Sequence, residues 1–189
     1  MQLTRLPIAD LAVIEPARFG DDRGFFSEVF REEWFRREVE DVALVQENHS
    51  LSRPAGTIRG LHFQAPGHPQ GKLVRVVRGS ILDVVVDIRR GSPTYGQHCA
   101  VELSAANGRQ LWCPVGFAHG FCTLEPDTEV VYKVSDYYSK ADDRGLAFDD
   151  PALGITWPCD IASATLSDKD RRQPKLAELP DYFVYGGNG

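Results

Sequence analysis

Two consecutive runs of β-branched residues, separated by a Gly-Ser turn, dominate the middle of the chain. The first covers residues 72–78, and the second covers residues 81–88, in which Asp83 and Asp87 stand among valines and isoleucines. β-Branched residues favour extended strands, whereas a Gly-Ser pair favours a turn. The two runs therefore predict two consecutive strands joined by a turn, and the second has the composition of a largely buried one.

Short segments of similar character recur along the rest of the chain, each bounded by Gly, Pro, Asn or Asp. Short strands at this spacing are typical of an antiparallel sandwich, jelly roll or barrel. Helical patterns are few: a short helix is predicted over residues 32–40, and a second is expected to begin near Ser167. The fold class is therefore mainly β with a few short peripheral helices. The further segments predicted as strands are residues 96–103, 108–113, 120–124 and 129–135.

The length of the chain suits one domain. Its 189 residues, of which 42% are hydrophobic and 10% aromatic, suffice to bury a substantial core. No repeat, low-complexity tract or linker interrupts the sequence. We expect a single domain over residues 1–189, with N-terminal strands in residues 1–50, a jelly-roll core in residues 51–160 and a helical tail in residues 161–189.

Charge and hydropathy argue against several classes of partner. The net charge of −6 disfavours general nucleic-acid binding, which needs a broad cationic face. No apolar run approaches the roughly 20 residues that span a bilayer, and no signal-like apolar block follows Met1. We therefore expect a cytoplasmic protein that binds neither nucleic acid nor membranes. Cys99, Cys113, Cys122 and Cys159 form no C-x-x-C pair, which in that compartment predicts reduced thiols.

The densest group of chemically versatile side chains lies in residues 59–64, Arg-Gly-Leu-His-Phe-Gln. If Leu61 and Phe63 face one side of a strand, His62 points to the other side together with Gln64. A histidine flanked by bulky apolar residues is, on its own, more often structural than catalytic. This segment alone therefore does not establish a catalytic site.

A second motif, G-x5-P-x-G-x2-H, runs from Gly108 to His119. It resembles the second motif of the cupin superfamily, small jelly-roll barrels in which this histidine commonly binds a metal. The first cupin motif would fall on residues 62–64, where the usual second histidine is missing, and no glutamate follows at a suitable distance. Two imidazoles are too few for a typical cupin metal site. We therefore expect no metal and no other cofactor, and a barrel interior suited to proton transfer.

Nine segments in order, spread over nearly the full length, carry a more specific resemblance. They are residues 20–26, 46–50, 59–64, 70–75, 114–120, 132–133, 137–138, 154–158 and 166–170. In these segments the chain resembles the dTDP-4-dehydrorhamnose 3,5-epimerase family (dTDP-4-keto-6-deoxyglucose 3,5-epimerase), metal-free relatives of the cupins. The resemblance implies a cupin-like antiparallel jelly-roll barrel.

The resemblance also implies a reaction. Members of the family invert C3 and C5 of dTDP-4-dehydro-6-deoxy-D-glucose to give dTDP-4-dehydro-L-rhamnose, in dTDP-L-rhamnose biosynthesis. Both carbons flank the C4 ketone, so the loss of either proton gives an enolate whose charge moves to the C4 oxygen. Inversion then requires a base on one face, an acid on the opposite face, and a cation or hydrogen-bond donor at the oxygen.

Four residues match the family's catalytic positions. His62 matches the base, because an imidazole is suited to accepting a proton near pH 7. Asp170 matches the carboxylate that fixes the tautomer of that imidazole. Lys72 matches the residue that stabilises the enolate oxygen, and Tyr132 matches the acid on the far face. Without the resemblance, these last three side chains would be a helix-start residue, a solvated cation and a core tyrosine.

Further positions match contacts to the nucleotide and the sugar. Tyr138 matches a residue whose ring stacks on thymine, and arginines suit the oxygens of a diphosphate. Asp143 stands where relatives often carry Glu. The family forms homodimers that exchange N-terminal segments, which implies that Arg23 and Glu28 reach the partner's site. The positions that match phosphate or sugar contacts are Arg23, Glu28, Gln46, Glu47, Asn48, Arg59, His119, Asp143 and Lys169.

Three alternatives stay open. A C3-only epimerase of the same family, acting on another dTDP-deoxysugar, would carry the same base, lysine and tyrosine. A metal-dependent cupin oxygenase or isomerase would share the fold, as would a catalytically silent sugar-nucleotide binding module. The sequence does not decide between thymidine and uridine nucleotides, or whether Arg171 and Arg172 contact the diphosphate.

Overall fold

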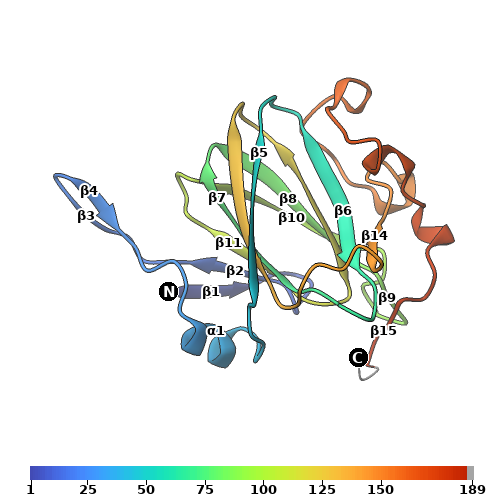
Figure 1. Cartoon of the computed structure of the whole chain (residues 1–189), viewed down its shortest axis with the longest axis horizontal. Coiled ribbons are helices and arrows are strands. Elements are labelled where there is room, and N and C mark those ends of the chain that lie inside the picture. Colours follow the sequence, from blue (N-terminus) through green and yellow to red (C-terminus); the bar gives the residue numbers. More distant parts are fainter. Residues whose placement is uncertain (187–189) are drawn as a thin grey trace.

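Two antiparallel sheets form most of the protein (Figure 1). The computed structural model describes residues 1–186. The six-stranded sheet has the order β1 (Gln2–Arg5), β2 (Ala12–Glu15), β11 (Gln110–Cys113), β7 (Lys72–Arg78), β13 (Thr128–Val134) and β5 (Gln46–Ser52). The five-stranded sheet has the order β10 (His98–Ser104), β8 (Ser80–Asp87), β12 (Phe117–Thr123), β6 (Ile58–Gln64) and β14 (Asp143–Gly145). Every pairing in these sheets is antiparallel, which confirms the mainly β prediction.

The strands predicted in the middle of the chain lie close to their expected bounds. β7 coincides with the predicted run, and β8 begins directly after Gly79, whose φ of 76° forms the turn between them. β12 begins at Phe117 rather than at residue 120. Gly116, with a φ of 90°, completes the preceding turn, so that Phe117 already pairs with Asp87 of β8. The sheet therefore includes His119 within a strand.

Apolar side chains form three layers. Between the sheets lie residues such as Val74 of β7 and Val85 of β8. A second cluster, which includes Leu61 of β6 and Trp157, packs the chain after β14 onto the outer side of the five-stranded sheet. A third cluster packs α1 (Glu32–Glu38) onto the six-stranded sheet, where the ring of Phe35 meets that of Trp112 edge-on at 4.9 Å. The jelly-roll core is thus covered on both outer sides.

The chain after β14 contains turns rather than the expected longer helix. The helix predicted near Ser167 is a single 3-10 turn, because Pro174 follows closely and Gln173 is extended (φ −72°, ψ 147°). The predicted helix over residues 32–40 ends at Glu38. Residues 187–189 of the predicted tail lie outside the described residues. The short elements of this part are η1 (Pro151–Leu153), η2 (Ile161–Ser163), η3 (Asp170–Arg172), η4 (Leu176–Glu178) and β15 (Phe183–Val184), which pairs with β9 (Arg89–Arg90).

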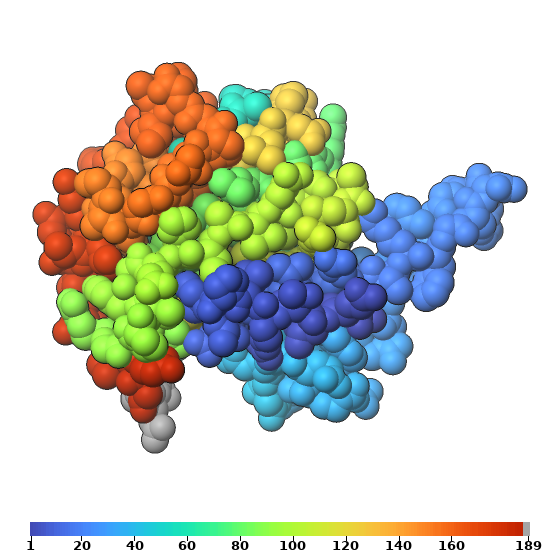
Figure 2. Space-filling model, turned by 180° about the vertical axis from the view of Figure 1, so that it is seen from behind, coloured from blue at the N-terminus to red at the C-terminus, as the bar shows by residue number. Residues whose placement is uncertain are grey.

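A hairpin near the N-terminus leaves the body of the molecule. Among the described strands, β3 (Phe19–Asp21) and β4 (Gly24–Phe26) pair only with each other, and they extend away from both sheets (Figures 1 and 2). Phe19, Phe25 and Phe26 on this hairpin are 62–70% exposed. Exposed aromatic rings gathered in one place are common on surfaces that bind other proteins. Within residues 1–186, no helix has the length and apolar character needed to cross a membrane.

Candidate active site

A pocket of about 360 Å³ is lined by side chains from both sheets. β5, β7 and β13 contribute from the six-stranded sheet, and β6 and β14 contribute from the five-stranded sheet. The remaining lining residues lie in the segments that connect elements of secondary structure. Its lining residues are Gln46, Asn48, His62, Phe63, Gln64, Gln70, Lys72, Tyr132, Tyr138, Asp143 and Lys169.

His62 on β6 is paired with a buried carboxylate. Its Nε2 lies 2.5 Å from Oδ1 of Asp170, and 30% of the histidine side chain is exposed. The hydroxyl of Ser167 donates a hydrogen bond to the other carboxylate oxygen of Asp170 at 2.8 Å. Burial acts to raise the pKa of Asp170, but the hydrogen bond and charge of His62 and the bond from Ser167 outweigh it and leave the pKa below its usual value. An ionised Asp170 accepts a hydrogen bond from the N–H of Nε2, and in that tautomer Nδ1 is the nitrogen that can accept a proton.

Lys72, at the start of β7, places its ammonium group in the protein interior. Its Nζ donates a hydrogen bond to the backbone carbonyl of His62 at 2.9 Å. Burial lowers the pKa of Lys72, and nearby Cys113 and Asp143 oppose the shift. A desolvated ammonium interacts strongly with any negative charge that develops beside it. Lys72 is thus suited to stabilise an oxyanion in the pocket.

Tyr132 enters the same pocket from β13, in the sheet opposite to that of His62. Burial raises the pKa of its phenol, Asp143 adds to the rise and Arg59 opposes it. The phenol is therefore protonated at neutral pH. Within residues 1–186, no hydrogen bond engages its hydroxyl. A protonated donor and a basic histidine thus line two different walls of one pocket.

Three side chains at the pocket rim form a short polar chain. The hydroxyl of Tyr138 donates to Oδ2 of Asp143 at 3.1 Å, and Nζ of Lys169 lies 2.5 Å from the same oxygen. The backbone N–H of Tyr138 donates to Oε1 of Gln46 at 3.1 Å, and Gln46 in turn donates to Asn48. The ring of Tyr138 is 56% exposed. An aromatic face beside an ammonium group suits a ligand that has both a planar base and a phosphate.

Comparisons with known proteins show the family to which this chain belongs. The family model described as dTDP-4-dehydrorhamnose 3,5-epimerase matches residues 5–178. The chain belongs to this family. A dTDP-4-dehydrorhamnose 3,5-epimerase of Sinorhizobium fredii is 57% identical over 185 residues, which are 98% of this chain and 94% of that protein. These findings confirm the family and the isomerase class expected from the sequence.

Solved structures of the family share the fold. The crystal structure of a dTDP-6-deoxy-D-glucose-3,5-epimerase from Legionella pneumophila, in complex with dTDP-4-keto-L-rhamnose, has a TM-score of 0.94 and 40% identity, and covers 98% of this chain and 99% of that one. A 3′-monoepimerase from Streptomyces bikiniensis, in complex with dTDP-quinovose, has a TM-score of 0.83 and 36% identity, and covers 92% of this chain and 87% of that one. The cupin-like jelly roll expected from the sequence is confirmed.

Of the four residues matched to the family's catalytic positions, three line the pocket and Asp170 bonds to one of them. Five of the ten matched to binding positions also line it. They are Gln46, Asn48, Tyr138, Asp143 and Lys169.

The other five predicted binding residues lie elsewhere. Arg59 on β6 donates to Ser52 and to the backbone of Leu51. His119 is buried, and its Nε2 lies 2.7 Å from Oδ1 of Asp83. The remaining three are Arg23, Glu28 and Glu47.

Three of these residues lie on the N-terminal side of the molecule. Arg23 is exposed on the hairpin and pairs with Asp21 at 2.5 Å. Glu28 and Glu47 line a separate groove of about 420 Å³, in which Glu47 pairs with Lys133 at 2.8 Å. Within one copy of the chain, therefore, these three side chains are not part of the pocket around His62.

Some members of the site are absent from the sequence-based prediction. Gln64 and Gln70 line the pocket and hold the backbone of residues 136–139. Gln64 could have been predicted from the alternation of side chains along the strand, which places it on the same face as His62. Outside the pocket, Asp83 is the partner of His119; it was recognisable as an acidic residue in an apolar strand, and its Oδ2 is buried without a hydrogen bond in the described part of the chain.

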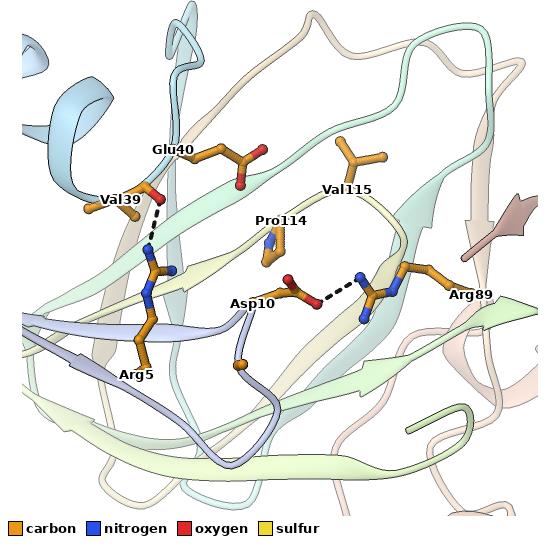
Figure 3. Close-up of a pocket in the computed structure, with 8 residues that line it drawn as sticks. Arg5, Asp10, Val39, Glu40, Arg89, Pro114 and Val115 are labelled. Atoms are coloured by element: carbon orange, nitrogen blue, oxygen red, sulfur yellow. Dashed lines mark hydrogen bonds and ion pairs between the residues drawn. The ribbon is translucent and has the colours of Figure 1, made fainter. Parts of the chain in front are cut away.

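A second hollow, of about 560 Å³, is shown in Figure 3. Its charged groups have partners: Arg5 donates to the carbonyl of Val39 at 3.0 Å, Arg89 lies 2.8 Å from Asp10, and the carboxylate of Glu40 accepts the indole N–H of Trp112 at 3.0 Å. The Arg5 contact joins β1 to the end of α1, and the Arg89–Asp10 pair joins β9 to the turn between β1 and β2, so these charged groups have a structural role. Across residues 1–186, no three His, Cys, Asp or Glu side chains are grouped as a metal site would require.

Proposed function

We propose that the chain inverts C3 and C5 of dTDP-4-dehydro-6-deoxy-D-glucose, giving dTDP-4-dehydro-L-rhamnose. The observation that carries this proposal is the pocket with the His62–Asp170 pair on one wall and the protonated Tyr132 on another, with Lys72 buried between the strands. Family membership supplies the substrate class.

The chemistry follows from these positions. Nδ1 of His62 takes the proton beside the ketone, and the electron pair of the broken C–H bond moves to the C4 oxygen. The imidazolium is stabilised by Asp170, and an N–H of Lys72 donates to the enolate oxygen. The hydroxyl of Tyr132 then protonates the same carbon on the opposite face. Water restores the proton of Tyr132 and removes the one gained by His62.

Contacts to the rest of the substrate are assigned to the rim. The ring of Tyr138 stacks on thymine, and Lys169 exchanges Asp143 for a diphosphate oxygen. Gln46 and Asn48 bond to the sugar or its phosphate. His119 and Arg59 serve the same site in this proposal, since His119 pairs with His62 across β12 and β6, and Arg59 lies near Tyr132.

A second copy of the chain completes the site in this proposal. The exposed rings of the hairpin β3–β4 are unfavourable in water unless another surface covers them. A two-fold dimer that exchanges these hairpins would cover the rings and bring Arg23 and Glu28 to the partner's pocket. The cytoplasmic location expected from the sequence stays a prediction.

Deuterium exchange tests the reaction. The purified protein is incubated in deuterated water with dTDP-4-dehydro-6-deoxy-D-glucose, and the label at each carbon is followed by NMR. Label at both C3 and C5, together with the L-rhamno product, is the expected result. No exchange at either carbon would contradict the proposal.

A C3-only epimerase is the second candidate, because a 3′-monoepimerase is among the structural relatives. The same base, lysine and tyrosine would then act at one carbon. Label that enters C3 alone, with no product inverted at C5, would establish this candidate in place of the first.

A further inference from the structure

Gln64 is a buried glutamine at the edge of the pocket that neither the reaction nor the substrate contacts employ. It is the last residue of β6, two positions after His62, and only 4% of it is exposed. A buried primary amide is costly unless its polar atoms are satisfied. The partners of this amide therefore indicate what it does.

The side-chain amide of Gln64 makes its hydrogen bonds to backbone groups. Its Nε2 donates to the carbonyl of His68 at 2.7 Å and to the carbonyl of Tyr137 at 3.2 Å. Its Oε1 accepts the N–H of Ser139 at 2.6 Å. Because an amide has two N–H donors, both are occupied and none is left for a substrate oxygen. Gln64 thus acts on the protein rather than directly on a ligand.

The residue between two of these partners is Tyr138. Gln64 bonds the peptide groups on either side of it, at Tyr137 and Ser139, while Gln46 bonds its own N–H. The ring itself is largely exposed, and its hydroxyl bonds only to Asp143 in the described part of the chain. The position of the ring over the pocket is therefore fixed through its backbone.

We propose that Gln64 is a positioning residue for Tyr138 and thereby sets the affinity of the pocket for the nucleotide. The inference rests on the proposed function, in which Tyr138 stacks on the base. Loss of the amide frees residues 137–139 to sample other conformations, so the ring must be ordered when the nucleotide binds, and binding weakens. The reacting atoms at His62, Lys72 and Tyr132 are not bonded by the Gln64 side chain, so the chemical step is retained.

The test replaces Gln64 with methionine, which has a similar shape and none of the hydrogen bonds. Calorimetric titration with dTDP should show binding weakened about tenfold, and KM for the 4-dehydro sugar should rise to a similar extent while kcat stays within about twofold. Gln97→Met is the matched control, because Gln97 also donates to a backbone carbonyl but is exposed and does not line the pocket. Its dTDP affinity should equal that of the parent. Gln64→Asn, which is too short to reach the same partners, replaces Gln64→Met if the latter does not fold.

A double-mutant cycle decides whether Gln64 acts through Tyr138. In a Tyr138→Ala background, Gln64→Met should change dTDP affinity by less than about twofold, because the ring that it positions is gone. An equal loss in both backgrounds would overturn the inference, as would an unchanged dTDP affinity or a fall in kcat at constant KM. A parent protein that binds dTDP without turnover would refute the proposed function alone, and the calorimetric cycle would still test Gln64. A parent that binds no dTDP would overturn both.

Discussion

Nε2 of His62 and Oδ1 of Asp170 lie 2.5 Å apart, although 108 positions separate them in the sequence. His62 belongs to a strand of the five-stranded sheet, and Asp170 belongs to a 3-10 turn in the chain that packs on the outer side of that sheet. The base is therefore assembled only when the late part of the chain is in place. Apolar residues that pack this late part of the chain onto the sheet, such as Trp157, therefore affect the site indirectly by holding Asp170 in position.

Replacement of His62 by asparagine should abolish nearly all turnover, with a loss of at least 10³-fold in kcat, because no other group takes the proton. The fold should persist, since His62 is partly exposed. Initial rates and circular dichroism measure the two outcomes. His49→Asn is the matched control: His49 also pairs with a carboxylate, Glu129 at 3.0 Å, but it lies outside the pocket. Similar losses in both variants would contradict the assignment.

Asp170→Asn should destabilise the protein by about 1–2 kcal/mol at pH 7. The folded pKa of Asp170 lies below its usual value, so the ionised carboxylate stabilises the fold above the unfolded pKa of about 3.9, and this contribution is lost as the pH falls through the folded pKa. The difference in the free energy of unfolding between parent and variant should therefore become smaller below about pH 4. Urea unfolding at a series of pH values measures it, with the exposed Asp149→Asn as the control that shows little gap at any pH.

Lys72→Met should lower kcat by about 10²–10³-fold, because the enolate oxygen loses its charged donor. Burial lowers the pKa of Lys72, so its ammonium form is lost at a lower pH than that of an ordinary lysine. In the parent, the alkaline limb of the kcat profile should accordingly begin below the usual lysine pKa of about 10.4. Stopped-time assays over pH 6–10 measure both effects. A variant with parental kcat would remove Lys72 from the mechanism.

Local sequence patterns predicted the central strands well, because strand formation there follows from β-branched runs and turn residues. The bounds of β7 coincide with its predicted run, and β8 differs by one residue at each end. The pairing of β7 with β13 and β11 was not predictable in this way, because the partners in a sheet are set by long-range packing. Helix propensity also gave a wrong prediction near Ser167. There, Pro174 and the hydrogen bond between His62 and Asp170 limit the helix to a single 3-10 turn.

The catalytic candidates came from family resemblance rather than from spacing. Lys72 and Tyr132 carry no local signal: one begins an apolar strand and the other lies within one. They lie on neighbouring strands of the six-stranded sheet, and their meeting with His62 depends on how the five-stranded sheet packs against it, which the sequence does not show. Arg23 and Glu28 differ from Lys72 and Tyr132, because they are expected to reach the pocket of another copy of the chain. A single copy does not bring them to His62.

Phe25→Asp combined with Phe26→Asp should convert the proposed dimer to a monomer, because two carboxylates would replace the rings that another copy covers. Sedimentation equilibrium measures the mass. Turnover should fall as well, since Arg23 and Glu28 could no longer reach the partner. Phe25→Leu with Phe26→Leu keeps an apolar surface and should remain dimeric. A parent protein that sediments as a monomer would refute the dimer.

Tyr132→Phe should separate proton removal from inversion. His62 still takes a proton from the substrate and Lys72 still stabilises the enolate, but the opposite face lacks its donor, so the proton returns from the side of His62. In deuterated water, NMR should therefore show label entering the substrate while inverted product falls by about 10²-fold or more. Tyr185→Phe, a tyrosine outside the pocket that stacks near Arg89, is the control and should invert at the parental rate. Loss of exchange together with inversion would mean that Tyr132 is needed for proton removal itself, and parental inversion would mean that another acid supplies the proton.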